Sequence, residues 1–102
     1  MVESFWNVEI RNNAIVCTSP QGDVDIMPIA SITSVKIETN DEGPLGTDVW
    51  WIIGSAVDAL VFPSGATGEQ QILQVLQQLP GFNNSAVVDA MICVEPKTFV
   101  CL

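Results

Sequence analysis

Apolar and polar residues alternate along most of the first two-thirds of the chain, which is the period of a strand that buries one face. Residues 5–10 show the pattern first, with Trp6, Val8 and Ile10 on one face. Further strands are predicted at residues 14–18, 23–27, 33–39, 48–53 and 57–62. Turns rich in Asn, Pro and Gly separate them, and residues 40–47, rich in Gly, Pro and acids, are expected to form a loop.

The fifth predicted strand breaks the alternation. Residues 49–53 are Val, Trp, Trp, Ile and Ile, all of them apolar. Neighbouring strand residues point to opposite faces, so Trp50 and Trp51 cannot enter the same core layer. Either both faces of this strand are covered, which places it centrally in a sheet, or one indole ring meets a partner.

The last third of the chain changes to helical spacing. The apolar positions of the predicted helix are Ile72, Leu73, Leu76 and Leu79, and glutamines supply the polar face. Thr67 and Gln70 have the spacing of a capping box at its start, and Pro80-Gly81 ends it. Asn83 or Asn84 is expected to cap a second, shorter helix, and residues 98–102 to form a final strand.

Six consecutive short strands with tight turns indicate an antiparallel sheet that is strongly curved or folded into a half-barrel. With the C-terminal strand, this sheet has six to seven strands. The amphipathic helix is expected to pack against it, with the second short helix near the C-terminus. We therefore predict a single α+β domain over residues 1–102.

Charge limits the classes of partner. The chain of 102 residues has 12 Asp and Glu against 3 Lys and Arg, a formal net charge of −9. Nucleic acid is not an expected partner, because phosphate binding depends on clustered Lys and Arg, and an anionic membrane is disfavoured for the same reason. No signal peptide is visible, and the most apolar stretch, residues 49–57, is far shorter than the roughly 18 residues of a membrane helix. We expect a cytoplasmic protein.

Common catalytic groups are missing from the composition. The chain has no His and no Tyr, which removes His-activated nucleophiles and His metal sites. Cys17, Cys93 and Cys101 form no Cys-x-x-Cys pair and are expected to be reduced, packed thiols. We therefore expect no enzyme activity, no cofactor and no metal.

Two loops resemble ligand-binding motifs only in part. Residues 40–48 carry several acids but lack the ligand spacing of an EF-hand. Residues 64–68 precede a predicted helix, as a phosphate-binding loop does, but they lack the nearby Lys that such a loop carries. A solvated loop and a helix cap are the expected roles.

The paired tryptophans are the most informative candidate site. In one interpretation both rings belong to the core. In the other, one ring lies in an apolar patch for dimerisation or partner binding, since Trp is favoured at binding hot spots, and nearby acids form a polar rim. The residues of this expected interaction surface are Trp50, Trp51, Asp41, Glu42 and Asp48.

Two resemblances add to this interpretation. The chain resembles a family of small uncharacterised bacterial proteins in the segments from Phe62 to Glu69 and from Leu76 to Asn83, and in Ala90-Met91. No activity is known for that family, so the resemblance transfers no function. Residues 25–32 and 35–37 are similar to the strand–bend–strand of bacterial pleckstrin-homology-like domains, which implies a roll-like fold. Six predicted strands before the helix, instead of seven, and the strand after it depart from that pattern. The basic loop that binds phosphoinositides is also missing, so lipid binding is not implied.

The leading hypothesis is a non-enzymatic protein-interaction module of a bacterial cytoplasm that binds a protein partner or itself as a homodimer. One alternative is a small acidic inhibitor or immunity-type protein that binds a basic target, with salt-sensitive association. Another is a small-molecule binder or enzyme with a pocket between sheet and helix. That alternative requires Cys17 or Cys101 to converge with carboxylates such as Asp48.

Overall fold

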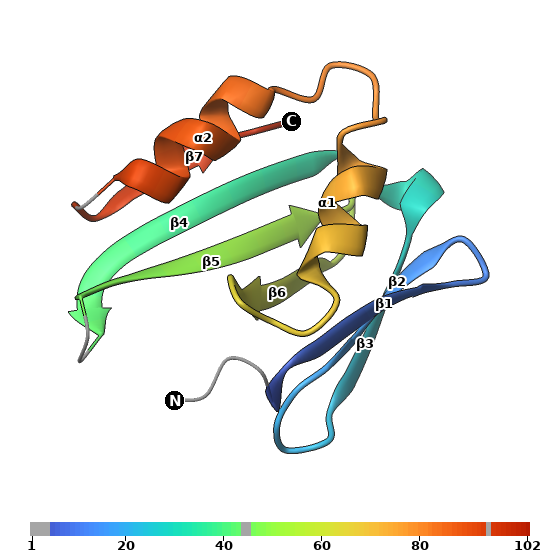
Figure 1. The fold of residues 1–102 in the computed structure, drawn as a ribbon. Coiled ribbons are helices and arrows are strands. Elements are labelled where there is room, and N and C mark those ends of the chain that lie inside the picture. Colours follow the sequence, from blue (N-terminus) through green and yellow to red (C-terminus); the bar gives the residue numbers. More distant parts are fainter. Residues whose placement is uncertain (1–4, 44–45, 94) are drawn as a thin grey trace.

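The computed structural model describes residues 5–43, 46–93 and 95–102 (Figure 1). The described chain forms seven strands and two α-helices: β1 (Asn7–Arg11), β2 (Ala14–Thr18), β3 (Val24–Pro28), β4 (Ser34–Gly43), β5 (Gly46–Gly54), β6 (Ala59–Pro63), α1 (Glu69–Leu76), α2 (Asn84–Ile92) and β7 (Lys97–Val100). Every pairing between these strands is antiparallel. The predicted α+β class with antiparallel strands is therefore confirmed.

The strands divide into two sheets instead of the single curved sheet that we predicted. A three-stranded sheet has the order β1-β2-β3 and a four-stranded sheet the order β6-β5-β4-β7. The division falls after Pro28, which has no N–H to donate to a ladder. A short 3₁₀ turn at Ile29–Ser31 then redirects the chain, and the Ile29 N–H donates to the Asn13 carbonyl at 3.0 Å.

A long hairpin takes the place of the predicted loop over residues 40–47. β4 continues to Gly43 and β5 begins at Gly46. The pairing shifts register between Asn40 and Gly43, which marks a bulge. The prediction was wrong because the Gly and polar residues that are typical of loops are also accommodated at a bulged hairpin end.

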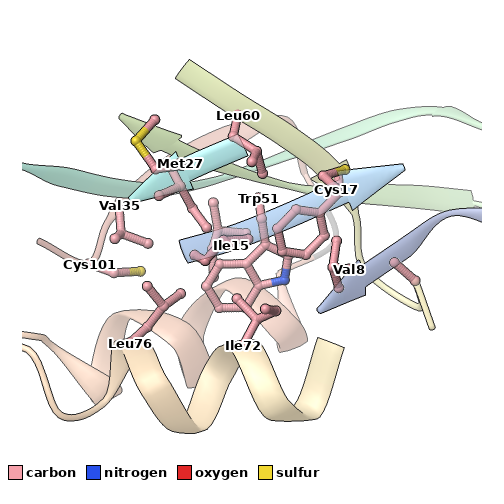
Figure 2. Packing of buried hydrophobic residues seen from close by; sticks show 14 of the residues in the cluster. Val8, Ile15, Cys17, Met27, Val35, Trp51, Leu60, Ile72, Leu76 and Cys101 are labelled. Carbon is pink, nitrogen blue, oxygen red and sulfur yellow. The ribbon is translucent and has the colours of Figure 1, made fainter. Parts of the chain in front are cut away.

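The buried core lies between the sheets and under both helices (Figure 2). The four-stranded sheet contributes alternate residues of its strands: Val35, Ile37, Trp51, Ile53, Leu60 and Phe62. The other elements contribute Val8, Ile15, Cys17 and Met27 from the three-stranded sheet, Ile72 and Leu76 from α1, and Ala86, Val87 and Ala90 from α2. The helices and the three-stranded sheet thus pack on one face of the four-stranded sheet, which we name its inner face.

α1 begins without the predicted capping box. Its N-cap is Gly68, which has a φ of 93°, and no side chain caps the helix there. A Cβ on Gly68 would lie 1.9 Å from the carbonyl oxygen of Val8, so the close approach of β1 requires glycine. This requirement displaces Thr67 from the cap, and the backbone N–H of Thr67 instead donates to the Trp6 carbonyl at 2.9 Å.

The second helix begins as predicted. The Asn83 side chain accepts a hydrogen bond from the Ala86 N–H at 3.2 Å, which caps α2. With nine residues against eight, α2 is not the shorter helix. The C-terminal strand is also present: β7 pairs with β4 at the edge of the four-stranded sheet.

Candidate protein-interaction surface

Trp51 lies on the inner face and belongs to the core. It is 1% exposed, and its ring stacks on Phe62 with centroids 6.3 Å apart and planes 16° apart. Figure 2 shows the ring between the sheets and α1. Trp51 is therefore removed from the expected interaction surface, because strand alternation turns it inward.

The buried indole N–H of Trp51 is satisfied by a carboxylate. It donates to Oε2 of Glu69 at 2.7 Å, and the Ser64 hydroxyl donates to the same oxygen at 2.8 Å. The Gly65 N–H donates to Oε1 of Glu69 at 2.9 Å. Glu69 is the first residue of α1, where the helix dipole also favours a negative charge. This role of Glu69 is not apparent from the sequence pattern.

Trp50 points to the opposite side of the same strand. Its ring is partly buried and meets the Trp6 ring edge to face, with centroids 5.9 Å apart and planes at 88°. Trp50 is not among the residues that pack in the core cluster. Of the two adjacent tryptophans, Trp50 is therefore the one available to a partner.

The register places other residues beside Trp50 on this side. One cross-strand row consists of Val61, Ile52, Lys36 and Val100. The next row consists of Pro63, Trp50, Glu38 and Thr98. We name the seven residues Lys36, Glu38, Trp50, Ile52, Val61, Thr98 and Val100 the outer face.

The outer face is open in the part of the chain that the structure describes. Val100 is 59% exposed and Val61 40%, and Ile52 is partly buried. The helices and the three-stranded sheet contribute their buried residues to the core on the inner side. The contact between Trp6 and Trp50 covers one corner of the outer face. Four of its seven side chains are thus apolar and available to a partner.

The charges of the outer face balance. Lys36 and Glu38 are its two charged residues; they lie two positions apart on β4 and both are exposed. The chain as a whole carries a net charge of −9. Its excess of acid is therefore not carried by the side chains of the outer face.

The expected acidic rim is not tested. The side chains of Asp41, Glu42 and Asp48 lie outside those that the structure describes. In the backbone register Asp48 pairs with Asn40, two residues along the strands from the pair of Glu38 and Trp50. Their role as a rim remains a prediction.

The thiols lie in different settings. Cys17 and Cys101 are buried and Cys93 is partly exposed, and all three are free. Burial, with a smaller contribution from Asp25, raises the pKa of Cys17 to about 11, and burial also raises the pKa of Cys101. Both buried thiols are therefore protonated near neutral pH, and the thiol is a poor nucleophile.

Exposed apolar side chains also gather at two other places. Val88, Met91 and Ile92 lie on α2, while Val24 and Ile26 lie on the edge strand β3. The sequence analysis predicted an apolar second helix, but it gave no signal that Val87 would be buried and Val88 exposed. Neither group forms part of the four-stranded sheet.

Among the described residues, no group of His, Cys, Asp or Glu is arranged to hold a metal ion. In the same part of the chain, no helix has both the length and the apolar character needed to cross a membrane. Comparison with protein-family models, curated proteins and solved structures gave no match.

Proposed function

We propose that this protein is a non-enzymatic protein-interaction module that docks its partner on the outer face. The observation that supports this function is the position of Trp50, Ile52, Val61 and Val100 on an open sheet face instead of in the core. An antiparallel sheet with one solvated face normally presents polar side chains there. Trp50, Ile52 and Val61 are neighbours on that face, with Val100 beyond Lys36, and an exposed apolar group of this kind is typical of a surface that binds another protein.

Trp50 supplies the expected centre of this surface. Large aromatic side chains that become fully desolvated at an interface contribute more binding free energy than their neighbours. Trp is among the residues most enriched at such hot spots. Trp6 holds the Trp50 ring from one edge, which limits the rotamer entropy that binding would cost. A partner that covers the outer face would complete the burial of this ring.

The proposed setting is a bacterial cytoplasm. Three free thiols support a reducing compartment, where disulfides rarely persist. The non-enzymatic part of the proposal rests on the lack of His and Tyr and on the protonated state of the two buried thiols.

Site-specific photo-crosslinking in cells tests this function. A photoreactive phenylalanine analogue at Thr98, on the outer face, is expected to give one or a few discrete protein adducts. The same analogue at Gln74, an exposed position on α1, serves as the matched control and should give none above background. Adducts of equal yield from both positions, or none from Thr98, would contradict the proposal.

The same crosslinking, repeated in a cell lysate at fixed ionic strengths, separates docking on the outer face from electrostatic capture of a basic target. Contact through a charge-balanced, apolar face should depend weakly on ionic strength, because little net charge is neutralised. An acidic inhibitor should lose its target steeply as salt rises. Adduct yield that collapses between low and physiological salt would therefore favour the inhibitor function.

A further inference from the structure

We propose that the outer face binds the outer face of a second copy of this chain and forms a two-fold symmetric dimer. This inference rests on the proposed function, because it names the partner of the same docking surface. Three features of the outer face support this dimer: the charge pattern on β4, the match of Ile52 with Trp50 between the apolar rows, and the balance of charge.

The charges of β4 are self-complementary in one orientation. Lys36 and Glu38 stand two residues apart on the outer face. A two-fold axis that lies in the interface and crosses the strands at the level of Ile37 brings Lys36 of each copy opposite Glu38 of the other. An axis parallel to the strands would instead bring Lys36 opposite Lys36. A two-fold interface requires a surface that complements itself, and this pair does so about the first axis only.

The same axis matches the central apolar residues. It exchanges the two cross-strand rows, so Ile52 faces Trp50 of the second copy. Val61 faces the end of the second row, where Pro63 is already buried within each copy, and Val100 faces Thr98. Sheets that pack face to face lie about 10 Å apart, a gap that side chains of this size fill. One geometry therefore satisfies both the charged pair and the contact between Ile52 and Trp50.

Charge also favours a second copy over a basic peptide at this surface. A net charge of −9 makes a basic partner attractive to the molecule as a whole. The outer face itself contributes one positive and one negative side chain, Lys36 and Glu38. A basic peptide would therefore find no excess of acid among these residues, whereas a second copy supplies the opposite charge at each position.

The size of the outer face sets the expected strength. Four strands give a width of about 19 Å, and about five residues per strand give a length of about 17 Å. Two copies together then cover roughly 650 Å² of sheet surface, which is below the roughly 1,000 Å² of a stable interface and fits a weak, transient dimer. We therefore expect a dimer with a dissociation constant on the order of 10–100 µM.

Charge-reversal variants in sedimentation equilibrium test the dimer. Lys36→Glu lowers the net charge from −9 to −11, and Glu38→Lys raises it to −7. Each single variant places like charges opposite one another, so each should weaken self-association about tenfold. The double variant Lys36→Glu/Glu38→Lys, and an equimolar mixture of the two single variants, should each recover association because opposite charges face each other again.

A net-charge effect predicts a different result. If general repulsion between acidic molecules controlled association, Glu38→Lys would self-associate more tightly than the parent chain. The double variant, which has the parent's net charge, would then associate no more tightly than the parent chain. That result would overturn the proposed dimer. Gln74→Glu, which adds one negative charge on α1, is the matched control and should change association less than twofold. Far-ultraviolet circular dichroism confirms that each exposed substitution leaves the fold intact.

Val61→Asp tests the apolar part of the interface and should also lower association about tenfold, since it buries a charge with no partner. A parent chain that stays monomeric at several hundred micromolar, or a dimer indifferent to both Val61→Asp and charge reversal, overturns the dimer. Heterologous adducts from crosslinking at Thr98 would then still support the interaction module with a different partner. If neither self-association nor crosslinking at Thr98 is detected, both the dimer and the interaction module are contradicted.

Discussion

The carboxylate of Glu69 connects the start of α1 to two other parts of the chain, strand β5 and residues 64–65. It accepts hydrogen bonds from the Trp51 indole on β5, from the Ser64 hydroxyl and from the Gly65 backbone. A buried indole N–H without a partner is costly, and so is an unpaired backbone N–H. Glu69 therefore fixes the start of α1 against the core strand.

Truncation of Glu69 should destabilise the fold. Glu69→Ala leaves the donors of Trp51, Ser64 and Gly65 without this acceptor, and we expect a loss of about 2–3 kcal/mol. Gln70→Ala, at the exposed next position, is the matched control and should cost less than about 0.5 kcal/mol. Urea unfolding followed by tryptophan fluorescence gives both values. Equal losses of unfolding free energy in the two variants would show that the Glu69 carboxylate does not stabilise the fold through its hydrogen bond with the Trp51 indole.

The thiol of Cys17 should make stability depend on alkaline pH. Burial, and to a smaller extent Asp25, raises its pKa from 9.0 to about 11 in the folded chain. The unfolded chain therefore loses this proton first as pH rises. The stabilisation from this group is complete below pH 9 and is lost between pH 9 and about 11.

Denaturation midpoints across that alkaline range test this linkage. Cys17→Ala should show a shallower decline of stability with pH than the parent chain, whatever its stability at neutral pH. Cys101 remains in both proteins, and burial also raises its pKa, so part of the decline should persist in the variant. Identical slopes would contradict the assigned role of Cys17.

At the scale of elements, β5 has an apolar residue at every position from Val49 to Ile53 but buries only one face completely. Trp51 and Ile53 are 1% and 0% exposed, whereas Trp50 and Ile52 are partly buried on the outer face. The strand is internal to its sheet, but its second face is not covered as the first of the two predicted alternatives required. The described chain covers its second face at one corner only.

Adjacent isoleucines on β5 should therefore differ in what they contribute to folding. Ile53→Ala opens a cavity in the core and should cost about 2–5 kcal/mol. Ile52→Ala removes the same atoms from the outer face and should cost the monomer less than about 1.5 kcal/mol. Urea unfolding at a protein concentration low enough to keep the chain monomeric gives the unfolding free energies of both variants. A larger loss for Ile52→Ala would mean that the two faces of the strand have been exchanged.

The sequence predicted most strands because each has a periodic pattern or a clear turn beside it. It did not predict the division into two sheets, because that depends on how the chain turns after Pro28. It also placed the cap of α1 at Thr67, because the close approach of Gly68 to Val8 comes from tertiary packing.

The candidate surface was predictable only in part. Alternation required Trp50 and Trp51 to point apart, but only the pairing with neighbouring strands decides which faces the core. Strand alternation turns Lys36 and Glu38 away from the buried Val35 and Ile37. The place of this charged pair beside Trp50 and Ile52 follows from the register, which one sequence does not determine.

At the scale of the whole molecule, an acidic chain presents one sheet face whose side chains balance in charge. Net charge keeps such molecules apart at long range, and a neutral apolar surface permits contact at short range. The groups on α2 and β3 also expose apolar side chains. They are the surfaces that a partner would use if the outer face did not serve as the docking surface.

A dilution series followed by amide and methyl chemical shifts tests the docking surface most directly. Between about 10 µM and about 1 mM, the predicted shifts concentrate on the outer face, with the methyl groups of Ile52, Val61 and Val100 changing together. The methyl groups of Ile26 and Ile92, on β3 and α2, should stay constant. Shifts that concentrate on those two residues, or no shifts across the series, would contradict self-association through the outer face.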